Sequence, residues 1–282
     1  MRRPLARILP AALVAAFAAS AGAQERLPIF DTHLHYSQPA WSEYPPADVI
    51  QRLDAAGVPR ALVSSSPDDG SLRLAAADPG RFVPVLRPYR ERFGPSDWLD
   101  DPGVVDYLAE RLDRRAYPGI GEFHVYADDA ARRPALARMV ALAVARGIFL
   151  HIHSAAGPVE RLFALDPRVK VLWAHAGMSE GPKAVGALLE RFENLWTELS
   201  FRAGSVAPDG KLDPEWRALI ERHAGRFMIG TDTFVNGRLA SYGELVDEHR
   251  RWLDQLPRPL AEAIAFRNAA RLFGGGRGAF PD

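Results

Sequence analysis

Two histidines separated by one residue follow an apolar run near the start of the chain. His33 and His35 come directly after residues 27–32, a segment whose apolar start is typical of a short buried β-strand. Successive side chains of a strand alternate between its faces, so His33 and His35 point the same way. Imidazole is the commonest metal ligand among side chains, and catalytic zinc takes three protein ligands. The pair is therefore a candidate for part of a metal site, although most such pairs are surface or core histidines, and the rest of the chain must decide between the two.

The composition indicates a protein whose stability depends on its hydrophobic core and not on disulfides. None of the 282 residues is cysteine, which excludes disulfides, thiolate metal ligands and a lipoprotein anchor. Thirty-five basic residues balance thirty-five acidic ones, so neither a nucleic-acid-binding surface nor a polybasic membrane surface is expected. We expect a small molecule as the partner, and no apolar stripe predicts a particular oligomeric state.

The first 23 residues have the pattern of a secretory signal peptide. Three arginines precede an apolar segment at residues 8–19, and small residues at 21–23 form a cleavage site. The apolar segment is shorter than the roughly 20 residues that span a bilayer, so a membrane anchor is not expected. The pattern predicts a secreted protein, with the bacterial periplasm as the preferred compartment, and a mature domain at residues 24–282.

Short apolar runs alternate with helical patterns through the rest of the chain. Most runs are apolar along their whole length, as are parallel strands that are buried on both faces. The expected strands are residues 28–32, 60–65, 82–87, 119–123, 148–153, 169–174, 195–199 and 226–231. The expected helices include residues 47–56, 134–146, 181–192, 213–223 and 238–256, with a last helix at residues 260–273.

Eight such units predict a (β/α)8 TIM barrel, an α/β fold of about 250 residues. We expect a single domain with an extra C-terminal helix. An open doubly wound sheet is the alternative, but no Gly-rich phosphate loop follows the first strand. The Pro- and Asp-rich stretch at residues 93–106 is expected to be a loop leading into a helix, not a domain boundary.

Polar side chains gather at the ends of the expected strands, where a barrel of this kind has its active site. The strand ends carry His33, His35, Arg87, Tyr89, Glu122, His124, His151, His153, His175, Glu198, Arg202 and Asp232. The remaining histidines, His223 and His249, fall in helical patterns and are expected to be solvated. The clustering predicts a metal site, although His124 and His151 could equally be hydrogen-bonded residues of the interior.

Together these residues resemble the amidohydrolase superfamily, and within it the amidohydrolase-related branch known as amidohydrolase 2. The resemblance covers nearly the whole chain after residue 23. It includes the His-x-His on the first strand, a histidine on the fifth and on the sixth, and an aspartate on the eighth. Residues 268–273 are similar to the closing helix of the branch.

The resemblance implies a divalent metal cofactor, with zinc as the expected ion, in one or two copies. His33, His35 and Asp232 would hold the more buried ion. His153 and His175 would hold a second ion or orient water and substrate, and Glu122 would bridge. Zinc would polarise a substrate oxygen and activate water, and Asp232 would pass the proton of that water to the leaving group.

Other side chains are expected beside the metal ligands. His151 faces the same way as His153 but lies one pleat deeper, where it could support the ligands. Asp31 could hold His33 in place or serve only as a hydrogen-bonding residue at the strand end. Candidates to contact the substrate are Arg87, His124 and Arg202, and an apolar pocket wall could come from Trp41, Tyr44 and Tyr126.

Three functions are compatible with this site. The resemblance implies a secreted metal-dependent hydrolase that cleaves an ester, lactone, amide or similar bond of a small molecule. The first alternative is a non-oxidative decarboxylase, a carbon–carbon lyase that uses the same metal site. The second is a non-catalytic barrel that binds a small molecule. Loss of a ligand would favour this last alternative, and every expected ligand is present in the sequence.

Overall fold

The computed structural model describes residues 26–90, 93–126, 133–274, 276 and 280–281. The expected signal peptide at residues 1–23 lies outside these residues. Within them, no helix combines the length and the apolar character that crossing a bilayer requires.

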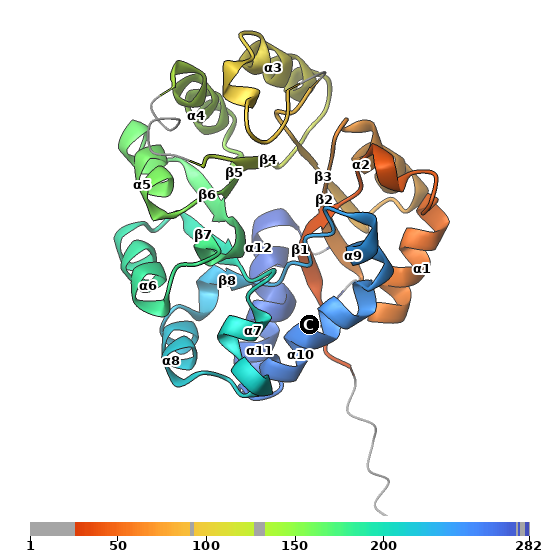
Figure 1. Ribbon diagram of the computed structural model, residues 1–282, viewed down its shortest axis with the longest axis vertical. Coiled ribbons are helices and arrows are strands. Elements are labelled where there is room, and N and C mark those ends of the chain that lie inside the picture. The colour runs from red at the N-terminus through yellow and green to blue at the C-terminus, as the bar shows by residue number, and fades with distance from the viewer. Residues whose placement is uncertain (1–25, 91–92, 127–132, 275, 277–279, 282) are drawn as a thin grey trace, which may run out of the picture.

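Eight parallel strands form one sheet in which each strand pairs with the next along the chain. The Thr32 N–H donates to the Ile229 carbonyl at 2.8 Å, which joins the first strand to the segment after the last. The sheet is thereby nearly closed into a barrel, with helices around the outside (Figure 1). The predicted (β/α)8 fold is confirmed.

The strands are β1 (Phe30–His35), β2 (Arg60–Ser65), β3 (Phe82–Leu86), β4 (Gly119–His124), β5 (Phe149–His153), β6 (Lys170–Trp173), β7 (Leu195–Glu198) and β8 (Phe227–Met228). The longer helices are α1 (Pro46–Ala56), α2 (Asp69–Ala77), α3 (Val104–Arg114), α4 (Pro134–Arg146), α5 (Ala156–Leu165), α6 (Pro182–Arg191), α8 (Pro214–Arg222) and α10 (Tyr242–Leu253). The shorter ones are α7 (Ala203–Val206), α9 (Asn236–Ala240), α11 (Arg258–Glu262) and α12 (Asn268–Phe273), with a π-helical turn at Ala263–Arg267.

Most predicted elements lie within a few residues of the observed ones. Helices α1 and α4 end where expected, at Gly57 and Gly147, whose left-handed backbone (φ 65° and 66°) suits glycine. The expected eighth strand is much shorter than predicted, because the chain after Met228 leaves the ladder and the Asp232 N–H donates to the His33 carbonyl instead. The expected helix at residues 238–256 is divided into α9 and α10.

Aromatic side chains close the amino-terminal end of the barrel. Phe273 of α12 packs on Phe30 at the start of β1 and on Phe149 at the start of β5, with ring centroids 6.4 and 5.0 Å apart. Phe280 stacks on Phe30 and on Phe266 at 5.8 and 4.9 Å. Helix α12 accordingly lies across the centre of the strands in Figure 1. This packing fills the end of the barrel opposite to the clustered polar residues.

Asp31 ties β1 to the segment after β8. Its buried carboxylate accepts hydrogen bonds from the Thr231 N–H at 3.0 Å, the Thr231 hydroxyl at 2.7 Å, the Tyr242 hydroxyl at 2.9 Å and the His33 N–H at 3.0 Å. Burial raises the pKa of Asp31 despite these donors. The contacts are those of a strand-end hydrogen-bonding residue, because Asp31 reaches His33 through the backbone amide and not through the ring.

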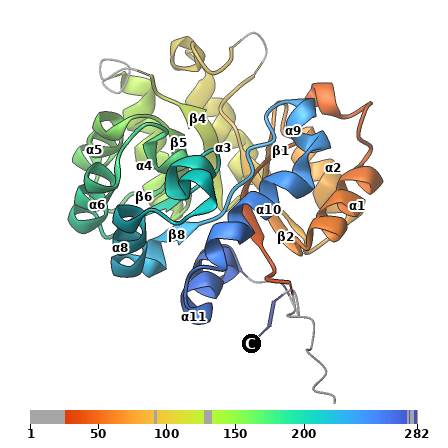
Figure 2. The ribbon, with the colours of Figure 1, turned by 60° about the horizontal axis from the view of Figure 1, so that its bottom comes forward.

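His249 is buried, so the expectation of a solvated side chain is wrong. It lies on α10, which packs beside α1 on the outside of the strands (Figure 2). Its Nε2 donates to the Gly230 carbonyl at 3.1 Å, and its Nδ1 accepts from the Trp252 Nε1–H at 3.2 Å. These two bonds require the neutral ring, and burial lowers the pKa of His249 to about 4.

We expect His249 to make the stability of the fold depend on pH. The pKa of His249 is about 4 in the folded protein and 6.5 ordinarily, so the unfolded chain binds the proton first as the pH falls. Stability is therefore lost between about pH 6.5 and pH 4, and the loss reaches about 2 kcal/mol at pH 4.5. Urea unfolding at pH 7 and pH 4.5 measures it. The loss should be smaller by that amount in His249→Gln, whereas equal losses would contradict a neutral His249.

Candidate metal centre

The carboxyl ends of the strands bring together the six side chains that the sequence proposes as metal ligands. They come from β1, β4, β5, the turn after β6 and the segment after β8. The six are His33, His35, Glu122, His153, His175 and Asp232. They form two adjoining groups of ligand atoms.

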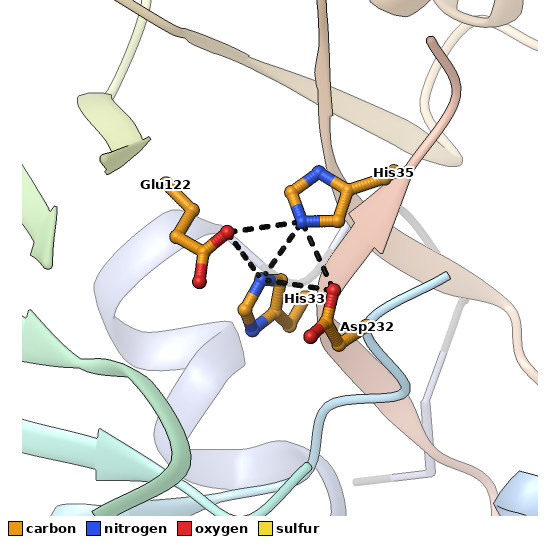
Figure 3. Close-up of side chains that lie close together, drawn as sticks. All are labelled: His33, His35, Glu122 and Asp232. Atoms are coloured by element: carbon orange, nitrogen blue, oxygen red, sulfur yellow. Dashed lines mark hydrogen bonds and ion pairs between the residues drawn. The ribbon is translucent and has the colours of Figure 1, made fainter. Parts of the chain in front are cut away.

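The first cluster consists of His33, His35, Glu122 and Asp232, which point toward one another (Figure 3). His35 Nε2 lies 3.1 Å from His33 Nε2, 3.2 Å from Glu122 Oε2 and 3.1 Å from Asp232 Oδ1. His33 Nε2 lies 3.5 and 3.6 Å from the same two oxygens. Zinc bonds of about 2.0–2.2 Å place tetrahedral ligands roughly 3.3–3.6 Å apart. The spacing fits a single ion.

The chemistry of the first cluster also favours a cation. Asp232 Oδ1 is buried and has no hydrogen-bond donor among the described residues. Burial lowers the pKa of His33, but the charges of Asp232, Glu122 and Glu198 more than offset it and raise that pKa well above its ordinary value. The same negative potential would hold a divalent ion among these ligand atoms.

Fixed partners orient the two rings of β1. His33 Nδ1 donates to Glu198 Oε1 at 2.9 Å, and His35 Nδ1 bonds to Ser64 Oγ at 2.7 Å. The Glu198 carboxylate requires a proton on His33 Nδ1, and Ser64 Oγ can accept one from His35 Nδ1; in that neutral tautomer Nε2 of each ring presents its lone pair to the first cluster. This arrangement is the one that metal-binding histidines commonly show.

Glu198 at the end of β7 is a site residue to which the sequence assigns no role. Besides His33, its buried carboxylate accepts from the backbone N–H groups of His175 and Ser200 at 2.8 and 2.7 Å, and from Ser200 Oγ at 3.0 Å. Ser200 Oγ in turn bonds to His175 Nδ1 at 2.7 Å. Burial would raise the pKa of Glu198, but the charge and hydrogen bond of His33, with a smaller contribution from His175, hold it well below its ordinary value. The feature of the sequence that could have pointed to Glu198 is its position at the end of an expected strand.

The second cluster consists of Glu122, His153, His175 and Asp232. Glu122 Oε1 lies 3.0 Å from His153 Nδ1 and 3.4 Å from His175 Nε2, and these two nitrogens are 3.1 Å apart. Asp232 Oδ2 lies 3.7 Å from His175 Nε2. Glu122 and Asp232 each direct one oxygen to each cluster.

Two glycines permit the close approach of the site strands. A Cβ on Gly230 would lie 2.2 Å from Glu198 Oε2 and 2.7 Å from His33 Cβ. A Cβ on Gly121 (φ 140°) would lie 2.3 Å from the His151 carbonyl oxygen. The pairing of β4 with β5 shifts just after Gly121, a bulge of the kind that re-aims the neighbouring side chain, here Glu122.

His151 lies beneath the first cluster. Its ring centroid is 4.5 Å from that of His33, and its Nε2 has no hydrogen-bond partner among the described residues. Burial lowers its pKa well below the ordinary value, so the ring is neutral. This geometry supports the proposal that His151 packs under the ligands without belonging to the two clusters.

A cavity of about 550 Å³ opens over the clusters. It is lined by Arg87, Pro95, Glu122, His124, Tyr126, His153, Met178, Phe201, Asp232 and Phe234. Of the side chains proposed to contact a substrate, Arg87, His124 and Tyr126 therefore lie at the cavity. Trp41, Tyr44 and Arg202 are not among its lining residues.

Arg202 is directed into the protein instead. Its guanidinium is buried and donates to the carbonyls of His175, Met178 and Glu180. It also lies over the Trp216 ring, 5.0 Å from the centroid. The geometry favours a role in holding the loop after β6 over the substrate contact expected for this residue.

His124 is held in one tautomer by Tyr89. The Tyr89 oxygen accepts from the His124 backbone N–H at 2.9 Å, and its hydroxyl lies 2.6 Å from His124 Nδ1. Burial raises the pKa of Tyr89, so the hydroxyl keeps its proton and donates it to Nδ1. Burial also lowers the pKa of His124 to about 3. The ring is neutral, and its proton resides on Nε2.

Residues 30–275 match the protein-family model described as Amidohydrolase. A comparison with curated proteins gives no match.

Solved structures with the same fold share little sequence with the chain. A candidate 2-pyrone-4,6-dicarboxylic acid hydrolase from Pseudomonas putida is 18% identical, with a TM-score of 0.61 over 88% of this chain and 98% of that one. A zinc-bound amidohydrolase from Burkholderia multivorans is also 18% identical, with a TM-score of 0.61 over 87% and 99%. A 5-carboxyvanillate decarboxylase from Novosphingobium aromaticivorans, in complex with manganese, is 12% identical, with a TM-score of 0.58 over 89% and 97%.

We expect Glu198→Gln to weaken metal binding about 10- to 100-fold, because the amide cannot replace the charge that orients and polarises His33. Competition with a chromophoric zinc chelator measures the affinity. Asp68→Asn is the matched control, since Asp68 is a buried carboxylate that binds Tyr117 and Arg111 instead of the clusters. A Glu198→Gln protein that is folded and binds zinc as tightly as the parent would refute the role of Glu198.

Proposed function

Because the chain belongs to the amidohydrolase family, we propose that it is a metal-dependent hydrolase that cleaves an ester, lactone, amide or similar bond of a small molecule. The observation that carries the proposal is the first cluster, in which four buried ligand atoms share one centre at the open end of the barrel. Zinc is the proposed ion, in keeping with the zinc-bound Burkholderia multivorans structure. We also propose that residues 1–23 direct the protein to the periplasm.

Each of the two clusters contains the side chains that we propose as ligands of one ion. His33, His35 and Asp232 would hold the first ion, and His153 and His175 a second, with Glu122 between them. A bound divalent ion would polarise the substrate carbonyl and lower the pKa of water in the site.

Asp232 is the proposed proton carrier. Burial would raise its pKa, but His33 and His35 outweigh that effect and lower the pKa of Asp232 to about 2. The side chain is therefore a carboxylate at neutral pH, and it lines the cavity. Such a group can accept the proton of the attacking water and then donate it to the leaving group.

His124 is the proposed hydrogen-bond donor to the substrate. Its Nε2 lies 4.0 Å from Glu122 Oε1 at the wall of the cavity. Since Tyr89 fixes the proton on Nε2, the neutral ring can donate to a substrate oxygen without adding charge to the site.

Non-oxidative decarboxylation at the same site is the second candidate. It is supported by the cation Arg87 at the cavity wall, which can bind a carboxylate, and by the fold shared with the 5-carboxyvanillate decarboxylase. The two reactions differ in their use of water. Hydrolysis in ¹⁸O-labelled water leaves labelled oxygen in the product, whereas decarboxylation leaves a product with one carboxylate fewer and no label.

We expect the mature protein, purified without chelator, to contain one or two equivalents of a divalent transition metal, and a His33→Ala/His35→Ala variant to lose it. Elemental analysis measures the content, and circular dichroism verifies folding. His223→Ala is the control, because His223 lies outside both clusters. Two equivalents would support bridging by Glu122. A folded parent that holds no metal even when zinc is supplied would refute the hydrolase and favour a barrel that only binds small molecules.

We expect Asp232→Asn to lower kcat by about 100-fold or more, because the amide cannot accept the proton of water. The rate is measured on whichever ester, lactone or amide the parent hydrolyses in a substrate panel. Metal content is determined in the same samples, which separates loss of the ion from loss of the base. Full turnover by Asp232→Asn would exclude Asp232 as the proton carrier.

A further inference from the structure

Large apolar side chains are exposed around the mouth of the cavity. In the described part of the chain, those with substantial exposure are Tyr126 (62%), Phe234 (58%), Val235 (46%), Phe201 (42%) and Met178 (40%). They follow β4, β6, β7 and β8, and all except Val235 line the cavity. Single exposed apolar residues are ordinary, but a group that surrounds one opening is typical of a binding site.

Two of these side chains stand on unusual backbone. Met178 has φ 58° and Phe201 has φ 61°, in the left-handed region that non-glycine residues rarely adopt. Such conformations persist where the surrounding structure imposes them, and they concentrate at binding sites. At both positions the fold presents a large apolar side chain to the cavity.

One aromatic wall of the cavity is formed by Phe201 and Phe234. The Phe201 ring lies 6.1 Å from the Phe234 ring and 5.6 Å from the His175 ring, the latter in a T-shaped arrangement. The Arg238 guanidinium lies over Phe201, 3.8 Å from the ring centroid. Phe201 is thus supported by Arg238 and stands beside the second cluster.

The other aromatic wall is formed by Tyr126, which follows β4. Its ring lies 5.2 Å from that of His124 and 6.3 Å from that of His153. In the eight-stranded order, β4 lies opposite β8, which precedes Phe234. The aromatic walls therefore come from opposite sides of the barrel, with ligands of the second cluster between them.

The charges at the cavity limit the charge of its occupant. Among the described lining residues, Arg87 is the cation, and Glu122 and Asp232 are the carboxylates. The Arg87 Nε–H already donates to the Glu122 carbonyl at 3.0 Å, and its Nη2 lies 3.6 Å from Glu122 Oε2. With the reacting carbonyl at the proposed ions, a second carboxylate elsewhere on the substrate would meet Arg87 as the one cationic side chain among the described lining residues, and Arg87 is partly neutralised. A neutral group, or one with a single carboxylate, suits these walls better.

We propose that the substrate carries an aromatic ring next to the bond that is cleaved, and no more than one carboxylate. The ring would lie between Tyr126 and the Phe201–Phe234 pair, with the reacting carbonyl at the two clusters. Phe201, Phe234 and Tyr126 would then determine substrate specificity. This inference rests on the proposed metal-dependent hydrolase, and it names the class of substrate for that same site.

The binding of hydroxamates tests the preference for an aromatic group without requiring that a bond be cleaved. Acetohydroxamate and benzohydroxamate share a metal-chelating group and differ in a methyl or a phenyl substituent. Isothermal titration calorimetry of the zinc-loaded mature protein should give a dissociation constant at least about tenfold lower for benzohydroxamate, since it alone buries a ring. A benzohydroxamate with two ring carboxylates should bind at least about tenfold more weakly than the unsubstituted one. Metal-free protein measures the binding that does not need the ion.

Phe234→Ala and its neighbour Val235→Ala form a matched pair. Both substitutions remove an exposed apolar side chain near the mouth of the cavity, but only Phe234 lines the cavity. Phe234→Ala should lower the preference for benzohydroxamate about threefold or more, and Val235→Ala should leave it unchanged. Phe201→Ala should act like Phe234→Ala.

The outcomes separate the inference from the proposed function. Equal affinities for the two hydroxamates, tight binding of the dicarboxylate, or equal effects of Phe234→Ala and Val235→Ala would overturn the aromatic substrate and leave the metal-dependent hydrolase standing. Zinc-loaded protein that binds neither hydroxamate would overturn the proposed function, and the substrate class with it.

Discussion

Buried negative charge at the open end of the barrel is the constraint on which the site depends. Glu122, Glu198 and Asp232 are nearly inaccessible to solvent, and a buried carboxylate is costly unless protons or cations compensate it. Glu198 meets this demand with N–H and O–H donors. Asp232 Oδ1 has no such donor among the described residues, and a cation at the first cluster would compensate its charge.

Other parts of the fold hold these carboxylates in position beside the histidines. Asp31 fastens the segment after β8 to β1 through Thr231 and Tyr242, which brings Asp232 beside His33 and His35. Gly230 leaves room for the Glu198 carboxylate behind His33. At the opposite end, the Phe30, Phe149 and Phe273 rings fill the barrel. Dense packing at one end and hydrogen-bonded strand ends at the other fix the positions of the proposed ligands, as a preorganised metal site requires.

The two clusters and the exposed apolar side chains around the cavity have separate roles. A (β/α)8 barrel hosts many reactions, and the loops after its strands distinguish them. In this chain four of the six proposed ligands, His33, His35, Glu122 and His153, lie on strands. The apolar side chains Met178, Phe201 and Phe234 all lie on segments that follow strands. The loops that carry the apolar side chains can therefore vary without moving the strands that carry most of the two clusters.

The order of the strands, the barrel and the side chains gathered at its open end could be predicted from the sequence, because hydrophobic runs and the alternation of His33 with His35 are local signals. The pairing of Glu198 with His33 could not, since it joins residues 165 positions apart. Nor could the burial of His249, which depends on the face that α10 turns to the barrel, or the inward turn of Arg202. Which residues reach the strand ends follows from the local pattern of apolar and polar residues. What each of them contacts depends on the folded barrel, because those contacts form between distant segments when the barrel closes.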